Sequence, residues 1–233
     1  MGNLMNFFLP HRCLACHTIV GNVPGLCAHC WEKVSFLTHS LCHCCGVFCE
    51  QLSTETALCA KCLTKRPIYT QARAAFLYTD FSRSFILPLK HGDQTYIAKY
   101  MAPWLWRAGA DFWPYVDAIV PTPLHWVRLF LRQYNQADLM AKHLSPLINK
   151  PILQALKRVR HTRPQGDLSH KQRYRNVARA FALADKCAVQ DKRIVLLDDV
   201  LTSGATANAC THVLKKAGAR DVFILTLART ALS

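Results

Sequence analysis

Short apolar runs recur along the chain after residue 66, separated by stretches in which apolar and polar residues mix. The runs lie at 72–78, 117–120, 194–197 and 221–227 and predict strands, most of them buried on both faces of a sheet. The stretches between them predict helices at 80–90, 96–112, 135–144, 169–177 and 205–217. Because strands and helices alternate, we expect an α/β fold with a doubly wound, mostly parallel sheet.

The first 66 residues follow no such alternation and are organised by cysteines instead. Four C-x-x-C pairs are separated by 10, 11 and 13 residues, which is too short for a large fold with its own core. Each pair can direct two sulfurs at one ion, so four pairs supply two tetrahedral sites for structural Zn2+, with no open position for catalysis. The predicted ligands are Cys13, Cys16, Cys27, Cys30, Cys42, Cys45, Cys59 and Cys62.

The spacing leaves the pairing open, because sequential and crossed pairs both complete two sites. Cys44 and Cys49 are additional thiols near the third pair, and they are either bystanders or a replacement for one ligand. The stretch at 63–71 contains Pro67 and has no periodicity, so we place the domain boundary there. We therefore predict a cysteine-rich zinc module at 1–66 and an α/β domain at 67–233.

Composition and charge narrow the class of protein. The chain is 51% hydrophobic, so it is globular, and no apolar run approaches the roughly 18 residues of a membrane span. The start lacks the features of a signal peptide, and the cysteine spacing favours metal ligation over disulfides, so we expect a cytoplasmic protein. The apolar segment at 1–13 packs on the body or, as the alternative, makes peripheral contact with the inner face of the membrane.

The formal net charge of +15 is concentrated in the predicted α/β domain. Residues 1–66 carry five Lys or Arg against three Glu, a difference of +2, which leaves +13 for residues 67–233. Such an excess suits a phosphate-rich partner, either a pyrophosphate ligand or a nucleic-acid backbone.

The stretch RIVLLDDVLTSGAT at 193–206 combines a buried strand, two carboxylates and a small-residue turn that opens a helix. A strand, a tight turn and a helix N-terminus direct several backbone N–H groups at one point, where a phosphate binds. Asp198 and Asp199 follow the strand beside that point, so a metal-bound ribose 5-phosphate fits the site. The predicted phosphate loop is Thr202, Ser203, Gly204, Ala205 and Thr206. An acidic pair alone is also typical of a solvated turn.

This stretch closely resembles the PRPP-binding motif of type I phosphoribosyltransferases. The resemblance implies that Asp198 and Asp199 contact the ribose hydroxyls and act as catalytic residues, and that the loop wraps the 5-phosphate of Mg2+-bound PRPP.

A second segment, VPTPLHWVRLFLRQYNQADL at 120–139, resembles the ComF/GntX family, which joins a cysteine module to a phosphoribosyltransferase-like domain. Where the family typically has Arg-Gly-Phe-Asn-Gln, this chain has Gln133 in place of the glycine. The resemblance implies a pyrophosphate-side loop in which Arg128 and Arg132 are candidate phosphate contacts. It continues through Arg160, Thr162, Gln165, Leu168, Arg173, Asn176 and Phe181 and covers nearly the whole chain.

Residues 157–179 hold eight Lys or Arg against one acid, Asp167, with a predicted mobile loop at 162–167. In type I phosphoribosyltransferases a flexible loop closes over the pyrophosphate, which implies that Arg160, Arg163 and Arg173 belong to a lid. The same charge density suits single-stranded DNA or RNA, with Tyr174 available for base stacking.

Two functions therefore remain open. The first is a Mg2+-PRPP-binding phosphoribosyltransferase with an unidentified acceptor. The second is a DNA-binding or protein-docking factor on the same scaffold, because the ComF branch is associated with natural transformation and the GntX branch with use of DNA as a nutrient. Single-stranded DNA and proteins of a DNA-uptake machinery are the partners that this resemblance implies. The chain has no Walker A loop and no H-E-x-x-H or G-x-S-x-G motif.

Overall fold

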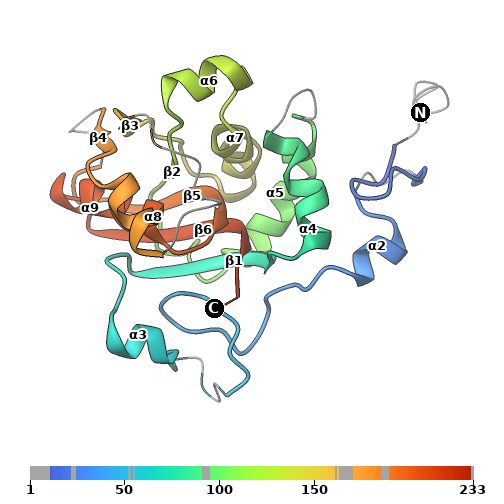
Figure 1. Cartoon of the computed structure of the whole chain (residues 1–233), viewed down its shortest axis with the longest axis horizontal. Coiled ribbons are helices and arrows are strands. Elements are labelled where there is room, and N and C mark those ends of the chain that lie inside the picture. Colours follow the sequence, from blue (N-terminus) through green and yellow to red (C-terminus); the bar gives the residue numbers. More distant parts are fainter. Residues whose placement is uncertain are drawn as a thin grey trace.

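The computed structural model describes residues 11–21, 25–51, 54, 56–90, 95–160, 162, 170–184 and 189–231 (Figure 1). Its centre is a four-stranded sheet in the order β1-β6-β5-β2, in which every neighbouring pair is parallel. The strands are β1 (Gln71–Leu77), β2 (Ala118–Pro121), β5 (Arg193–Leu201) and β6 (Asp221–Arg229). The predicted parallel α/β sheet is confirmed.

Helices cover both faces of this sheet, as a doubly wound fold requires. One face packs against α4 (Asp80–Ile86), the 3-10 helix η1 (Pro88–Lys90), α5 (Ile97–Ala108) and α7 (Gln136–Ile148). The other face packs against α8 (His170–Val177) and α9 (Ala205–Lys216). Along β5, Val195 and Leu197 enter the first core and Ile194 and Leu196 the second, because successive side chains of a strand point to opposite faces.

The two central strands are longer than the apolar runs that predicted them. Pairing of β5 with β6 continues through Asp198↔Thr226 to Leu201↔Arg229, so the two aspartates lie within the strand and not after it. Two further strands, β3 (Leu156–Arg158) and β4 (Phe181–Leu183), form a separate antiparallel pair that the sequence analysis missed. The predicted mobile loop at 162–167 lies outside the described residues except for Thr162.

The predicted loop with Arg128 and Arg132 is wrong in form, because these residues lie on a helix, α6 (Trp126–Arg132). The His125 ring accepts a hydrogen bond from the Val127 N–H at 3.3 Å and caps the helix. The helix ends at Gln133 with φ of 64°, in the left-handed region that favours glycine. Gln133 thus keeps the backbone conformation that the family's glycine suits.

The cysteine module consists of two similar ribbons, with helices α2 (Ala28–Glu32) and α3 (Ala60–Thr64). Each ribbon begins with a short antiparallel bridge, Arg12↔Ile19 in the first and Leu41↔Phe48 in the second. The chain between the ribbons lies along the outer edge of β1, where the Leu37 N–H donates to the Ala75 carbonyl and the Leu77 N–H to the Ser35 carbonyl, at 3.0 and 2.8 Å. The boundary at residue 66 stays a prediction.

The two tryptophans of α5 differ in environment. Trp104 packs edge-on against Phe36, Phe76 and Phe85 and joins the first ribbon to the sheet, whereas Trp106 is exposed. In the described part of the chain, no helix is long and apolar enough to cross a membrane.

Candidate phosphate-binding site and metal centres

The eight cysteines of the C-x-x-C pairs form two clusters, each with its sulfur atoms within 4.8 Å of one another. The first holds Cys13, Cys16, Cys27 and Cys30, and the second holds Cys42, Cys45, Cys59 and Cys62. The pairing is therefore sequential, and Cys44 and Cys49 belong to neither cluster.

The donor set and its surroundings fit structural zinc. Four thiolates complete a tetrahedral shell, and backbone N–H groups support the sulfurs in both clusters. The Cys27 N–H donates to Cys13 Sγ and the Cys59 N–H to Cys42 Sγ, each at 3.3 Å. Because four protein sulfurs leave no open position, these centres hold the fold and perform no chemistry.

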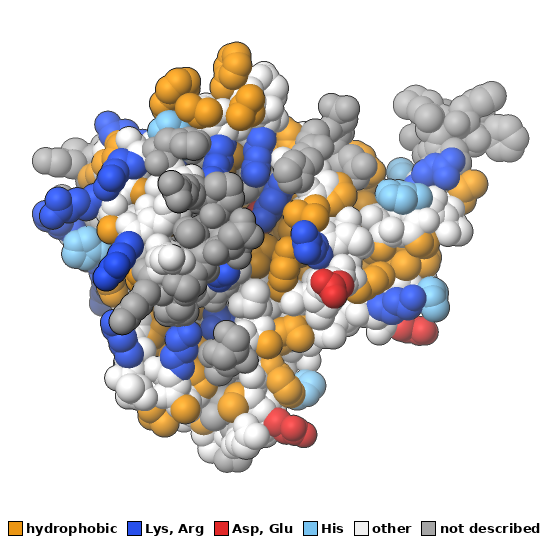
Figure 2. Space-filling view, in the orientation of Figure 1, with side chains coloured by type: hydrophobic (Ala, Val, Ile, Leu, Met, Phe, Trp, Pro, Cys, Tyr) orange, Lys and Arg blue, Asp and Glu red, His pale blue; other side chains and the backbone are white. Residues whose placement is uncertain are grey.

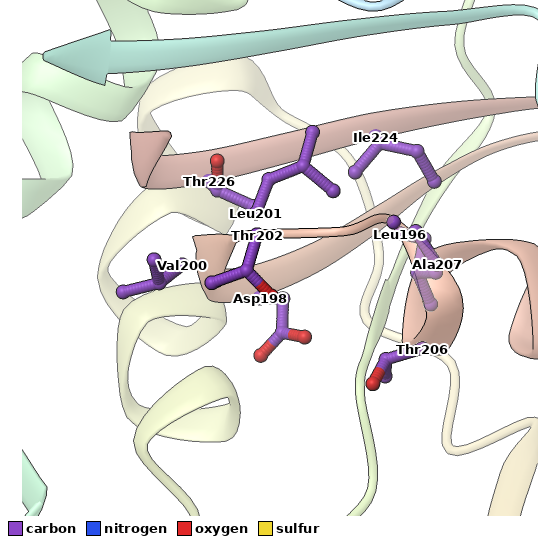
Figure 3. Close-up of a pocket in the computed structure, with 10 residues that line it drawn as sticks. Leu196, Asp198, Val200, Leu201, Thr202, Thr206, Ala207, Ile224 and Thr226 are labelled. Atoms are coloured by element: carbon purple, nitrogen blue, oxygen red, sulfur yellow. The ribbon is translucent and has the colours of Figure 1, made fainter. Parts of the chain in front are cut away.

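The acidic pair lies at the carboxyl end of β5, and its two side chains point to opposite faces of the sheet. Asp199 is buried and accepts from Lys90 Nζ at 2.7 Å and from Gln136 Nε2 at 3.4 Å. Asp198 lines a small pocket together with Thr202, Gly204 and Thr206, and in Figure 3 its carboxylate and the Thr206 hydroxyl lie on the same side of the loop. The pocket therefore presents one carboxylate, while the other holds a cation of the protein itself.

This arrangement makes the two carboxyl groups electrostatically unequal. Burial and the neighbouring Asp199 charge raise the pKa of Asp198 to about 7. Burial acts to lower the pKa of Lys90, but the Asp199 carboxylate outweighs it and raises that pKa. Asp198 is thus a carboxyl group that a ligand's hydroxyls or metal ion would hold in its charged form.

The loop between β5 and α9 has the geometry of an anion site. Gly204 has φ of 77°, which turns the chain directly into α9. The Asn208 amide donates to the Gly204 carbonyl at 2.9 Å, and the Tyr174 hydroxyl of α8 donates to the Ser203 carbonyl at 3.2 Å. Backbone carbonyl oxygens accept both of these hydrogen bonds. The backbone N–H groups in the first turn of α9 therefore form the side of the loop on which an anion would bind.

The structure brings together only some of the predicted phosphate-binding arginines. Arg128 donates to the Thr162 carbonyl at 3.0 Å, and Arg132 donates to the Gln136 amide oxygen at 3.3 Å. Burial and the nearby Arg132 lower the pKa of Arg128, so these two cations are close neighbours. Farther along the chain, Arg160 is exposed and Arg173 is half-buried, and Arg163 lies outside the described residues.

Three residues of the site were missed by the sequence analysis: Lys90, Gln136 and Arg158. Burial and the charge of Arg128 lower the pKa of Arg158, and its guanidinium donates to the Thr162 hydroxyl. Gln136 belongs to the RQYNQ segment and was available from that motif. Lys90 and Arg158 carry no local signal, because only the folded chain brings them to the aspartates and to Arg128.

A larger groove, of about 1040 Å3, lies on the other side of the loop, between the second ribbon, α8, β3–β4 and α9. Ser203 and Asn208 belong to its wall, and Tyr174, Ile68 and Val159 give it an apolar, partly exposed surface. Its basic lining residues are Lys61, Lys65, Arg66, Arg175, Arg179, Lys216 and Arg229, and the described lining includes no Asp or Glu. Figure 2 shows Lys and Arg side chains spread over the α8–α9 side, while the acidic side chains that are clearly visible in this view lie toward the right and the bottom of the picture.

A double zinc ribbon, a parallel α/β domain and a strand–Asp-Asp–TSGAT–helix loop together define a phosphoribosyltransferase-like protein. Residues 4–63 match the family model of the double zinc ribbon domain. The chain is 33% identical over 237 residues to Competence protein F of Haemophilus influenzae, covering 97% of this chain and 100% of that protein. It is 30% identical to the DNA utilization protein YhgH of Escherichia coli K12, covering 89% and 98% of the two chains. The chain belongs to the ComF/GntX family of competence protein F and its relatives.

Two solved structures are similar to part of the chain. The glutamine PRPP amidotransferase of B. subtilis is 19% identical with a TM-score of 0.38, and the match covers 55% of this chain and 25% of that one. The adenine phosphoribosyltransferase of Thermoanaerobacter pseudethanolicus is 14% identical with a TM-score of 0.38, covering 65% and 87%.

Proposed function

We propose that this protein binds PRPP with Mg2+ at the carboxyl end of β5. The observation that carries the proposal is the position of Asp198 beside the loop Thr202–Thr206, at the N-terminus of α9. A 5-phosphate then occupies the loop, and the ribose hydroxyls and the metal face the acidic pair.

The remaining charged groups suit the pyrophosphate. Arg128, Arg132 and Arg158 gather on one side of the site, while Arg160, Arg163 and Arg173 are proposed lid residues. In the proposed reaction an acceptor forms a bond to the anomeric carbon, the bond from that carbon to the pyrophosphate oxygen breaks, and pyrophosphate leaves. The acceptor is left open, because no side chain of the site selects a base.

Isothermal titration calorimetry of PRPP with Mg2+ tests the binding. We expect saturable binding by the zinc-loaded wild type and at least about tenfold weaker binding by Asp198→Asn/Asp199→Asn. The matched control is Asp191→Asn, an exposed carboxylate next to β5 but outside the site, which should bind normally. If the folded wild type binds no PRPP, the proposed site is wrong.

A second function, binding of single-stranded DNA, is supported by the basic groove beside the loop. Its cations match a phosphate backbone, and Tyr174 and Ile68 offer surfaces on which bases stack. This fits the names of the relatives, which concern competence and DNA utilization. We therefore propose a cytoplasmic role in DNA uptake or utilisation, among the proteins of a DNA-uptake machinery.

Fluorescence anisotropy with a labelled oligothymidylate, repeated over a range of salt concentrations, tests this second function. Several phosphate contacts predict a slope of log K against log salt of about −0.7 for each contact. Arg175→Gln/Arg179→Gln should flatten that slope, whereas Arg83→Gln, outside the groove, should not. A slope near zero for the wild type would count against DNA in the groove.

A further inference from the structure

Helix α6 exposes most of its apolar side chains. Trp126, Phe130 and Leu131 are 70%, 72% and 75% exposed, Leu129 is 43% exposed, and α6 has no buried residue. In Figure 2 these apolar side chains form the projection at the top of the molecule, where Figure 1 places α6.

The polarity of this helix is reversed relative to an ordinary surface helix, which turns its apolar face to the core. The guanidinium of Arg128 reaches the Thr162 carbonyl and that of Arg132 reaches Gln136, so both arginines turn toward the body. The aromatic and leucine side chains turn toward solvent instead. Solvent exposure of three such large side chains on one short helix is a mark of an interaction surface.

The positive charge around this projection favours an anionic partner over a second copy of the chain. Between Asp117 and Asp138 the chain has no Asp or Glu, while Arg128 and Arg132 lie at the base of the projecting side chains. A second copy of the chain would bring like charges together, in a protein that already carries +15. An anionic surface is attracted by the same charges.

The shape of the projection agrees with a lipid surface. The side chains stand out from the body in Figure 2 and line neither of the two pockets described above, so they suit insertion into a soft, flat interface. Tryptophan, phenylalanine and leucine enter the boundary between headgroups and acyl chains, while the positive charge behind them attracts the anionic headgroups at longer range. We propose that α6 docks the protein on an anionic phospholipid membrane through Trp126, Phe130 and Leu131. This inference does not rest on PRPP or DNA binding.

Vesicle flotation of the full, zinc-loaded chain tests the proposal. The wild type should float with vesicles of phosphatidylcholine and phosphatidylglycerol in equal parts, and much less with phosphatidylcholine alone. The variant Trp126→Ser/Phe130→Gln/Leu131→Gln should lower the partition coefficient about a hundredfold, because the inserted apolar area is lost. Arg132→Gln should lower it about fivefold, the weight of one cation at an anionic surface.

The matched control is Leu63→Gln, which removes an equally exposed leucine (71%) from the second ribbon. It should float as the wild type does. Tryptophan fluorescence gives a second readout: the blue shift on adding anionic vesicles should disappear in Trp126→Phe, although the other four tryptophans remain. If the wild type stays in solution, or if the triple variant floats equally well, the proposal is overturned. Wild-type self-association that the triple variant abolishes, without lipid binding, would assign α6 to a dimer instead.

Discussion

The two zinc ribbons share one ligand pattern but differ in how the rest of the protein holds them. In the first, Cys16 is exposed and Cys27 partly exposed, and contact with the body consists of apolar packing, in which Leu14 is buried in the core of the sheet and Trp31 lies against Trp104. In the second, all four ligands are buried. The first ribbon is therefore held by side-chain packing, whereas the second is also held by hydrogen bonds to two strands of the sheet.

The hydrogen bonds of the second ribbon explain this difference. The Ala72 N–H at the start of β1 donates to the Cys44 carbonyl at 2.8 Å. Arg229 at the end of β6 donates from Nη2 to Cys45 Sγ at 3.5 Å. Both strands therefore depend on the ribbon, and Cys45 and Cys62 reach the wall of the basic groove. Two ribbons with the same cysteine motif therefore differ in how closely they are bonded to the strands of the sheet.

Loss of a zinc ligand should give the largest difference in stability effect between the two ribbons. Cys59→Ser should destabilise the whole α/β domain by about 4 kcal/mol or more, because the second site supports β1 and β6. Cys16→Ser should release zinc from the first ribbon and leave the domain's main unfolding transition nearly unchanged. Circular dichroism melting with parallel zinc analysis measures both. Equal losses from the two variants would contradict the comparison.

The residue that follows the first C-x-x-C pair of each ribbon gives a sharper test. Gly46 has φ of 66°, and an added Cβ would lie 2.3 Å from the Ala72 carbonyl oxygen. Gly46→Ala should therefore cost about 3 kcal/mol in urea unfolding, through clash and strain. The equivalent position in the first ribbon already holds a side chain, His17, at φ of 59°. The control His17→Ala should change stability by less than about 0.5 kcal/mol.

The buried Arg229 should show a smaller effect of the same kind. Arg229→Met removes the donor to Cys45 while keeping an apolar side chain of similar length, and we expect a loss of about 2 kcal/mol in urea unfolding. The matched change in the first ribbon is Arg12→Met, which removes a hydrogen bond from an exposed guanidinium to the His17 carbonyl at 3.2 Å. That change should be nearly neutral. A neutral Arg229→Met would show that the second zinc site holds the strands without it.

The last test concerns the carboxyl end of β5. Because the folded-state pKa of Asp198 is raised to about 7, its ionisation opposes folding, and stability falls as the pH rises from about 4 through 7. Asp198→Asn should remove this penalty, so its gain in stability should be greatest above about pH 7 and nearly absent below pH 4. If the second ribbon unfolds together with the domain, Asp198→Asn should slow zinc release from that ribbon by the factor that corresponds to the gain in stability. Zinc release from the first ribbon should not respond.

The sequence was sufficient where the signal is local. The cysteine pairs predicted both metal clusters, and the apolar run before Asp198 located the central strand. It was insufficient where the signal comes from distant partners. Strands β3 and β4 have three residues each and exist through their mutual pairing, and β5 extends past the acidic pair because β6 continues beside it. Helix α6 escaped prediction because its seven residues, Trp126–Arg132, are too few for a periodic pattern to identify a helix.

The ion pair between Lys90 and Asp199 bears on how the proposed PRPP site would bind its ligand. The Lys90 ammonium group already neutralises the buried Asp199 carboxylate, so departure of the proposed ligand would leave no uncompensated charge on Asp199. A lone divalent ion would have to compete with a tethered cation that is always present. Under the proposed function, an ion that arrives already chelated by phosphates would bring its own anchoring groups to the loop and would displace the lysine. Binding would then depend on the whole ligand and not on the metal concentration alone.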